Sequence, residues 1–429
     1  MNDRCTGYRP NRKLVHRVRC RRNVALTVLV LALLIGPFVR VLGAEDPELT
    51  RQEIWKQKRI EKSKNLHQDR RSGLENAMLY IQREKILQRL SAGWNGWHPK
   101  LGGLSTGSGF AGGLRYAPSL ARGNVVFETS GAISTRTYQF YDLKLGAPRL
   151  VNGRLFTEFY SRYRSYPQED FFGLGPNSRR SDRTSYALED SLFEFTMGVN
   201  WTRWLATGFR QGYIKNNVGR GTDRRFRSTE QVFASSEVPG LDRQTDFYRT
   251  QAFAQVDYRD EPGNAHAGGF YGVTFSYYDD RNLDLHTFRR IDAEVQQYFP
   301  FFQKKRVIAF RARTSLADVS PSQSVPFYMM DVLGGSETLR GFREFRFRDQ
   351  NLLLLNLEYR WEAFSGLDMA IFGDAGKVTR RRSDIDFKDL KTDVGFGFRF
   401  NTIKSVFLRI DVGFGNEGKR IFFKFGPAF

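Results

Sequence analysis

From residue 102 onward the chain is a series of short segments in which apolar and polar residues alternate, separated by turns rich in Gly, Asn, Asp and Pro. A period of two places successive side chains on opposite faces of a β-strand. No long helical pattern separates the segments, as it would in a fold built from βαβ units. The sequence therefore predicts an all-β protein, either a barrel or a sandwich of antiparallel strands.

Fourteen segments have a clear strand pattern. In chain order they are 107–116, 125–144, 154–163, 185–201, 205–216, 247–258, 269–278, 287–298, 306–316, 352–361, 367–378, 392–400, 406–415 and 421–429. The segment 125–144 is long enough for two strands, and 219–246 has room for another pair. The strand count is therefore open by two.

The first 44 residues have the pattern of an export signal. Eight arginines and lysines stand before the apolar run 24–38, and Gly43 and Ala44 offer the small residues that signal cleavage requires. An uncleaved anchor over 24–42 is the alternative, which Arg40 and the long basic front keep open. We expect a signal peptide at 1–44, a periplasmic helical segment and linker at 45–100, and a barrel at 101–429.

The segment 45–90 is charged and lacks strand patterning. Leu74, Met78 and Ile81 recur at helical spacing, which predicts one or two amphipathic helices. A solvated linker is the alternative, because charged runs of this kind also stay unfolded in water.

Two of the predicted strands show how the sheet would meet a membrane. In 352–361 one face is wholly apolar and the other polar: Leu353, Leu355, Leu357, Tyr359 and Trp361 against Asn356, Glu358 and Arg360. A soluble sandwich would bury the first face, so this strand alone does not decide. In the last strand Ile421, Phe423, Phe425, Pro427 and Phe429 share one face. An apolar outside repeated behind an export signal predicts a transmembrane barrel in the outer membrane of a Gram-negative-type bacterium, because lipid tolerates no open sheet edge.

The charge of the chain suits a membrane surface. The formal net charge is +21, and removal of residues 1–44 leaves 58 Lys and Arg against 45 acids, or +13. The excess is spread along strand-like stretches, which favours contact with anionic outer-membrane lipids, including lipopolysaccharide, over nucleic acid. Cys5 and Cys20 both lie in the expected signal peptide, so the exported chain would have no thiol for a disulfide or a metal site.

One loop stands out between two predicted strands: LGGSETLRGFREFRFRDQN, residues 333–351. Its central part, LRGFREFRFRD, resembles the loop-six motif of the BamA/TamA superfamily, the bacterial surface antigen barrels. Four further segments agree with this family in order and spacing, namely FFGLGPNS at 171–178, VDYRDEPGNAHAGG at 256–269, FGDAGKV at 372–378 and FKFGPAF at 423–429. The resemblance covers about 102–429 and implies sixteen strands.

The resemblance also implies a site. The loop would fold back into the barrel lumen with Arg340, Gly341 and Phe342 at its tip, and Glu358 and Asp374 on the wall would hold Arg340. Glu358 lies on the polar face of its strand by alternation alone, whereas Asp374 rests mainly on the resemblance.

Other positions in this loop are predicted from their residue types. Gly334, Gly335 and Gly341 would let the backbone turn and approach the wall. We expect Arg343 and Arg348 to face water.

A lateral seam between the first and last strands is the second implied feature. We place it between 107–116 and 421–429, with Gly109, Phe110, Phe423, Phe425 and Phe429 along it. Glycine and proline weaken strand pairing, so this junction should open more readily than the others.

These features imply insertion or translocation of outer-membrane proteins or lipids, with client proteins as partners. Members of the family that handle proteins usually carry POTRA modules before the barrel, and 45–100 offers no strand-rich module of that kind. A separate periplasmic subunit is left open. A barrel enzyme acting on lipids and a passive pore are the alternatives, and the basic loop 219–246 is read as solvated, with lipopolysaccharide binding as its sharper interpretation.

Candidate catalytic residues are weak, and we assign no catalytic, metal-binding or cofactor-binding residue. Ser105 in GLSTG fits a nucleophile elbow, but the elbow needs a strand before it and a helix after it. His286 is the one histidine placed for lipid hydrolysis, and the sequence places no nucleophile beside it, so a wet interfacial histidine is expected. Asp257 and Asp260 are predicted to be parts of a structural turn.

Overall fold

The computed structural model describes residues 51–64, 93–105, 107–402 and 405–429, together with the single positions 73, 76 and 80. The expected signal peptide and the pattern of Leu74, Met78 and Ile81 lie outside the described residues. The chain divides into two units, Met1–Arg70 and Arg71–Phe429. In the part of the chain that is described, no helix is long and apolar enough to cross a membrane.

The first unit contains the helix α2 (Arg51–Lys64). Glu53 lies in its first turn and Lys62 and Lys64 lie in its last, which suits the partial charges at the two ends of a helix. A helix in the charged segment before the barrel is therefore confirmed, and its Trp55 side chain is exposed.

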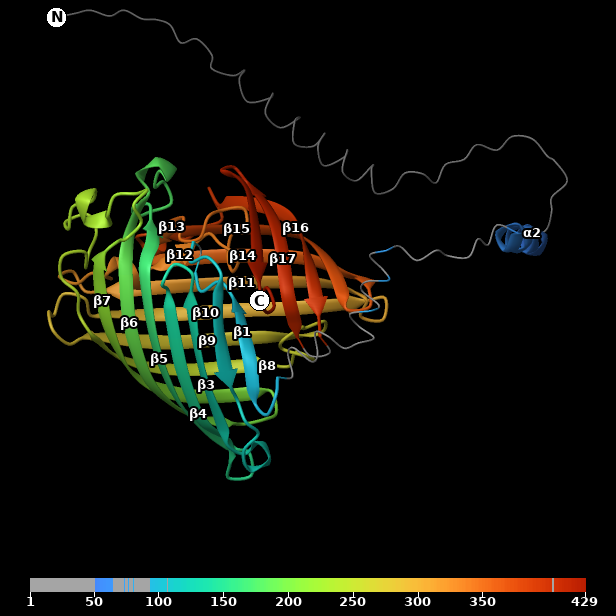
Figure 1. Cartoon of the computed structure of the whole chain (residues 1–429), viewed down its shortest axis with the longest axis horizontal. Coiled ribbons are helices and arrows are strands. Elements are labelled where there is room, and N and C mark those ends of the chain that lie inside the picture. The colour runs from blue at the N-terminus through green and yellow to red at the C-terminus, as the bar shows by residue number, and fades with distance from the viewer. Residues whose placement is uncertain are drawn as a thin grey trace, which may run out of the picture. The chain divides into compact units, whose positions relative to one another are not determined.

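The second unit is a nearly closed barrel of sixteen antiparallel strands, each paired with its neighbour along the chain, as predicted (Figure 1). The strands are β1 (Trp97–Gly102), β2 (Ala111–Tyr116), β3 (Val126–Ser134), β4 (Gln139–Leu150), β5 (Leu155–Phe171), β6 (Thr184–Asn200), β7 (Leu205–Arg220), β8 (Phe247–Asp257), β9 (Gly268–Asp280), β10 (Phe288–Phe301), β11 (Arg306–Val319), β14 (Asn351–Phe364), β15 (Leu367–Thr379), β16 (Lys391–Asn401), β17 (Val406–Gly415) and β18 (Gly418–Lys424). In Figure 1, β3–β7 form the near wall and β8–β11 cross behind them.

The remaining elements lie in the connections between these strands. They are β12 (Asp331–Leu333), β13 (Phe347–Asp349) and the short 3-10 helices η1 (Ala121–Gly123), η2 (Arg180–Asp182), η3 (Thr229–Gln231), η4 (Phe327–Met329) and η5 (Arg382–Asp384). We call the end of the barrel that carries the β5–β6, β7–β8 and β11–β14 connections the loop end, and the opposite end the turn end.

The strand count was reached by a different route from the one predicted. The segment 125–144 splits into β3 and β4, whereas the described structure has no strand inside 221–246. The sixteenth strand is β1, which begins inside the predicted linker. Trp94 and Trp97 exchange two backbone hydrogen bonds of 2.8 Å across the turn that starts it. Pro99 lies within this strand, and proline is tolerated in a strand at the edge of a sheet.

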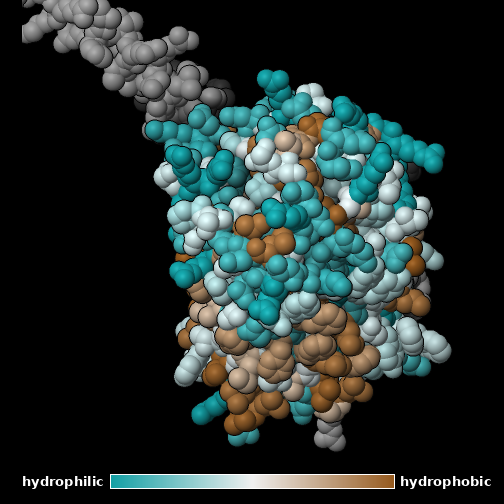
Figure 2. All heavy atoms as spheres, turned by 90° about the vertical axis from the view of Figure 1, so that its left-hand side faces the viewer, coloured by the Kyte–Doolittle hydropathy of each residue, from teal (hydrophilic) through white to brown (hydrophobic). Residues whose placement is uncertain are grey.

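Alternation along the strands separates a polar lumen from an apolar outside. On β14 the side chains of Asn356, Glu358 and Arg360 are buried inside, whereas Leu357 is exposed outside, as its alternation predicted. Figure 2 shows one side of the molecule, on which apolar side chains gather toward the lower part and polar ones toward the top.

At the loop end, the β11–β14 connection packs against the inside of the wall. Phe327 of η4 is fully buried and packs edge-on against Phe171 of β5 at 5.3 Å and Tyr186 of β6 at 5.0 Å, measured between ring centroids. These contacts are the centre of a large apolar cluster that lines β5–β10 inside this end of the barrel.

The last residues depart from the predicted face. Phe423 and Phe425 are exposed outside, as expected, but Gly426 has a φ of +106° and breaks the alternation. Phe429 therefore turns inward, where its carbonyl oxygen accepts a hydrogen bond of 2.9 Å from the Tyr298 hydroxyl. The placement of Phe429 on the outer face is wrong, because a glycine in the left-handed region redirects the chain.

Candidate functional site

The connection between β11 and β14 is a loop that folds into the lumen; we call residues 320–350 the lumen loop. β12 pairs with β13, so that Leu333 stands opposite Phe347 and the tip 334–346 projects from a short hairpin. Gly334 and Gly335 have φ values of +106° and +101°, which side chains rarely allow. The predicted reason for these two glycines is therefore present in the backbone.

Arg340 is 2% exposed at the centre of this site. Its Nε and Nη2 donate to Asp374 Oδ2 and Oδ1 at 2.8 and 2.6 Å, and its Nη1 donates to Glu358 Oε1. The guanidinium also lies 3.5 Å from the centroid of the Phe372 ring. The structure thus brings Arg340 together with both acids that the resemblance implied. The face of the Phe372 ring stacks on the guanidinium and stabilises its charge.

Charge balance keeps this arginine protonated. Burial lowers the pKa of the Arg340 guanidinium, but the carboxylates of Asp374 and Glu358 outweigh burial and hold that pKa well above its usual range. The loop tip is therefore tied to the wall by a permanent charge.

Glu358 is shared by three arginines. Besides Arg340, it accepts from Arg360 Nε at 2.6 Å and from Arg399 Nη2 at 3.0 Å. The Glu358 side chain is fully buried, so water does not compete for its oxygens. One carboxylate therefore connects the loop, β14 and β16.

The network continues to β17, which the sequence analysis missed. Arg399 Nη1 donates to Asp411 Oδ1 at 2.6 Å, and Arg409 Nε lies 3.1 Å from Asp411 Oδ2. Arg409 also donates to the loop carbonyl of Ser336 at 2.9 Å. Both arginines lie on the polar face of their strands, which is the sequence signal that could have found them.

The loop backbone approaches the wall as closely as glycine allows. A Cβ on Gly341 would lie 2.5 Å from Asp393 Cβ, and a Cβ on Gly413 would lie 2.3 Å from the Arg340 carbonyl oxygen. Phe342 is fully buried beside them and packs edge-on against Phe347 at 5.4 Å between ring centroids. Glycines on both partners thus allow the tip to lie directly on β17.

Two other loop arginines do not face water as predicted. Arg348 is buried, and it donates at 2.9 Å both to the Phe327 carbonyl oxygen and to the Tyr186 hydroxyl. Arg343 is paired with Asp170 on β5. Alternation could not reveal this, because Asp170 on β5 and Tyr186 on β6 lie far from the loop in the sequence.

The wall ends in two open edges. Among the described residues, no backbone hydrogen bond joins β1 to β18, and the two strands approach where a Cβ on Gly102 would lie 3.0 Å from the Phe425 ring. The sequence analysis placed the first strand of the seam at 107–116, which is β2, whereas the strand at this end of the wall is β1. Gly109 and Phe110 precede β2, which pairs with β1 on one side and β3 on the other.

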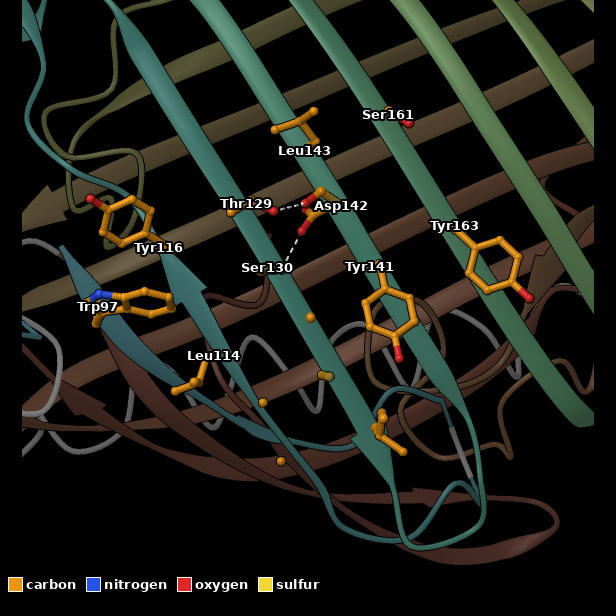
Figure 3. A pocket seen from close by; sticks show the side chains of 15 residues that line it. Trp97, Leu114, Tyr116, Thr129, Ser130, Tyr141, Asp142, Leu143, Ser161 and Tyr163 are labelled. Atoms are coloured by element: carbon orange, nitrogen blue, oxygen red, sulfur yellow. Dashed lines mark hydrogen bonds between the residues drawn. The ribbon is translucent and has the colours of Figure 1, made fainter.

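A groove runs along the outer face beside the β1 edge (Figure 3). Its volume is about 660 Å³, and Gly112 and Gly131 leave its floor without side chains. The rings of Tyr116, Tyr141 and Tyr163 stand around it.

The turn end is crossed by the β8–β9 turn. The Gly263 carbonyl oxygen accepts from the Val406 N–H of β17 at 3.0 Å, and His266 Nε2 lies 3.8 Å from Asp368 Oδ2. Asp260 Oδ1 accepts the N–H groups of His266 and Ala267 at 3.0 and 3.1 Å. These contacts agree with the predicted structural turn. They join the β8–β9 turn to β15 and β17 at this end of the barrel.

The Asp260→Asn variant is expected to weaken this turn in a pH-dependent way. Burial raises the pKa of the Asp260 carboxyl, but the backbone donors and Lys304 outweigh it and hold that pKa at about 2. A carboxyl whose pKa is depressed in the folded state stabilises the fold at pH values above its unfolded pKa of about 3.9. This stabilisation is lost as the pH falls toward 2. Because the carboxyl is partly exposed and water screens its charge, we expect a loss of about 1 kcal/mol or less at neutral pH.

Thermal unfolding of the folded barrel at pH 6.5 and pH 2.5 measures this effect. The difference between wild type and Asp260→Asn should shrink at the lower pH. The exposed neighbour Glu261→Gln is the matched control, and a difference that stays the same at both pH values would contradict the assignment.

Catalytic chemistry finds limited support. His286 is buried rather than wet, contrary to prediction, and Ser324 Oγ lies 3.1 Å from its Nδ1. That nitrogen also lies 3.0 Å from the Ser324 carbonyl oxygen, so a proton on Nδ1 satisfies the carbonyl and leaves no base for the hydroxyl. Ser105 is followed by the strand β2, and no helix is described between them. Among the described residues, no three His, Cys, Asp or Glu side chains could hold a metal ion.

Comparisons with known proteins agree with this geometry. The model of the Omp85 superfamily domain matches residues 124–429. The chain is similar to BamA from Haemophilus ducreyi lacking POTRA domains 1–3, with 16% identity and a TM-score of 0.54 over 78% of this chain and 70% of that one. It is also similar to CdiB from Escherichia coli, with 13% identity and a TM-score of 0.50 over 76% of this chain and 61% of that one.

At identities this low, the structural similarity shows a shared fold and nothing more about function. No curated protein matches the sequence. The family expected from the loop motif is nevertheless confirmed, since the matched residues include the lumen loop, both acids that hold it and the last strand. The chain belongs to the Omp85 superfamily.

Proposed function

We propose that this protein inserts or translocates proteins at the outer membrane, and that the open edges of β1 and β18 receive the client chain. The carrying observation is that the wall ends in two strands with no partner among the described residues. An unpaired strand edge offers a row of N–H and C=O groups that another strand can pair with. Hydrocarbon cannot satisfy these groups, so a transient strand partner is favoured over lipid.

The lumen loop supports the proposal. Its tip lies on β17, next to β18, and is held by a buried charge network rather than by a continuous sheet. Such a loop stiffens the last strands while leaving the edge itself unpaired. BamA and CdiB share the fold, and what those proteins act on is carried to this chain as part of the proposal alone.

Joining the two edges covalently is expected to abolish the activity. We would place cysteines at Gly102 and Phe425, with Cys5 and Cys20 changed to serine, and join them by oxidation or with a short bifunctional reagent. Purified protein in lipid vesicles should speed the folding of an added outer-membrane barrel, read as its heat-modifiable band. The joined form should fold that client no faster than empty vesicles do, and a reducing agent should restore the rate after oxidation.

The control joins two strands that already pair. Cysteines at Gly112 and Ile133 are register partners on β2 and β3, so joining them should leave the rate unchanged. Full activity of the protein joined at Gly102 and Phe425 would exclude a role for the edge. Ion conductance through the vesicles without any client folding would favour the passive pore instead.

A further inference from the structure

Arg420 of β18 has an environment that the charge network of the lumen loop does not explain. Its side chain is half-buried and its Nε is buried with no hydrogen-bond partner. Its register partner on β17 is Gly413, which has no side chain to cover it and lies against the Arg340 carbonyl oxygen. The guanidinium therefore stands where the lumen loop meets the open edge.

Three further arginines gather around this position. Arg180 comes from the β5–β6 connection and donates to the Glu417 carbonyl oxygen at 3.1 Å, three residues before Arg420. Arg183 follows Arg180 by three residues, and Arg343 of the lumen loop pairs with the same carboxylate as Arg183, that of Asp170. We call Arg180, Arg183, Arg343 and Arg420 the arginine cluster.

The acids nearby do not balance this cluster. Asp170 is shared, because Arg183 Nη2 lies 2.8 Å from its Oδ1 while Arg343 pairs with its Oδ2. Glu417 is bonded to a fifth arginine, Arg346, at 2.7 Å.

Arg183 lies over the Phe226 ring, the Phe226 N–H donates to the Asp223 carbonyl oxygen, and the Asp223 carboxylate is paired with Arg225 at 2.8 Å. The cluster and its bonded acids therefore keep a surplus of positive charge. Like charges this close repel, and a bound anion relieves the repulsion.

We infer that the arginine cluster binds a phosphate group at the loop end of the barrel, beside the open edge of β18. Guanidinium groups bind phosphate oxygens with two parallel hydrogen bonds, which makes arginine the preferred residue for this chemistry. Arg420 has an unused donor, and Arg180 is exposed, so the ligand has both a partner and an approach from solvent.

A phosphorylated lipid head group and a free phosphate share this chemistry. The observations favour a lipid, because the neighbour of Arg420, Ile421, is 56% exposed on the outer face of the same edge strand, where it could contact an acyl chain. A bound head group would join the edge strand, the β5–β6 connection and Arg343 of the lumen loop.

The test uses purified full chain in detergent and measures the binding of a fluorescent phosphatidic acid, with the matching phosphatidylcholine as the neutral-head-group comparison. Wild type should bind phosphatidic acid more tightly. Arg420→Gln should weaken that binding about tenfold, the usual scale for one charge-assisted hydrogen bond. Arg180→Gln, at an exposed position, should weaken it in the same direction.

The matched control is Arg289→Gln, which removes an exposed arginine from β10 and should leave binding unchanged. Competition by inorganic phosphate separates the two sources. Displacement at millimolar phosphate assigns the site to phosphate itself, whereas no displacement assigns it to the intact lipid. Equal binding of the two lipids by wild type, or equal affinities of all three variants, would overturn the inference.

Discussion

Replacing Glu358 with glutamine is expected to destabilise the barrel more than any other single change in the lumen. The amide keeps the shape of the side chain but removes the charge that Arg340, Arg360 and Arg399 share. Removing one partner of a buried ion pair costs about 3–5 kcal/mol, because the remaining charge stays buried without compensation. The temperature at which the folded band is lost in heat-modifiability gels, and unfolding in urea, both measure this cost.

The matched control lies on the same strand. Glu362 is exposed at the end of β14, and Glu362→Gln should change stability by less than about 0.5 kcal/mol. Equal behaviour of the two variants would show that water reaches the network and screens it.

Replacing Arg340 with alanine is expected to release the tip of the lumen loop. The change removes the arginine that binds Asp374, while Glu358 keeps Arg360 and Arg399. We expect a loss of about 3–5 kcal/mol if the site stays dry, and much less if water fills it. Trypsin should then cut after Arg343 or Arg346, which the docked loop protects, at a rate well above that of wild type.

Two further variants separate charge from geometry. Arg340→Lys should restore only part of the protection, because an ammonium group lacks the planar fork that serves two carboxylates. Arg224→Ala removes an exposed loop arginine and should have no effect. If Arg340→Ala were cut no faster than Arg224→Ala, the loop would not depend on this contact.

The losses of stability caused by Arg340→Ala and by Glu358→Gln should not be additive. Combining Arg340→Ala with Glu358→Gln removes both members of one pair, so the double variant should lose less free energy than the sum of the single losses. A simple sum would mean that the two residues act independently.

The fold was readable from the sequence because alternation of side chains is a local property. It placed Glu358 on the polar face of β14 before any family was considered, and the structure puts that carboxylate in the lumen. Where alternation was interrupted, prediction failed. The short edge strand β1 was included in the predicted linker, and Gly426 turned Phe429 away from the face that parity assigned to it.

The site was only partly readable, because its contacts cross the lumen. Arg348 meets the Tyr186 hydroxyl, 162 positions earlier in the chain, and Arg343 meets Asp170. No local pattern reports such pairs. The motif predicted Arg340 and its two acids, whereas Arg399 and Arg409 required knowledge of which strands face the loop.

The position of Arg340 in the chain bears on the order of folding. Glu358, Asp374 and Gly413, which hold or touch it, all come later in the sequence. The loop tip is therefore synthesised before its binding surface exists, and it can dock only after β14, β15 and β17 have joined the wall. The time at which the tip becomes protected from protease would therefore report when the carboxyl-terminal strands join the barrel wall during folding.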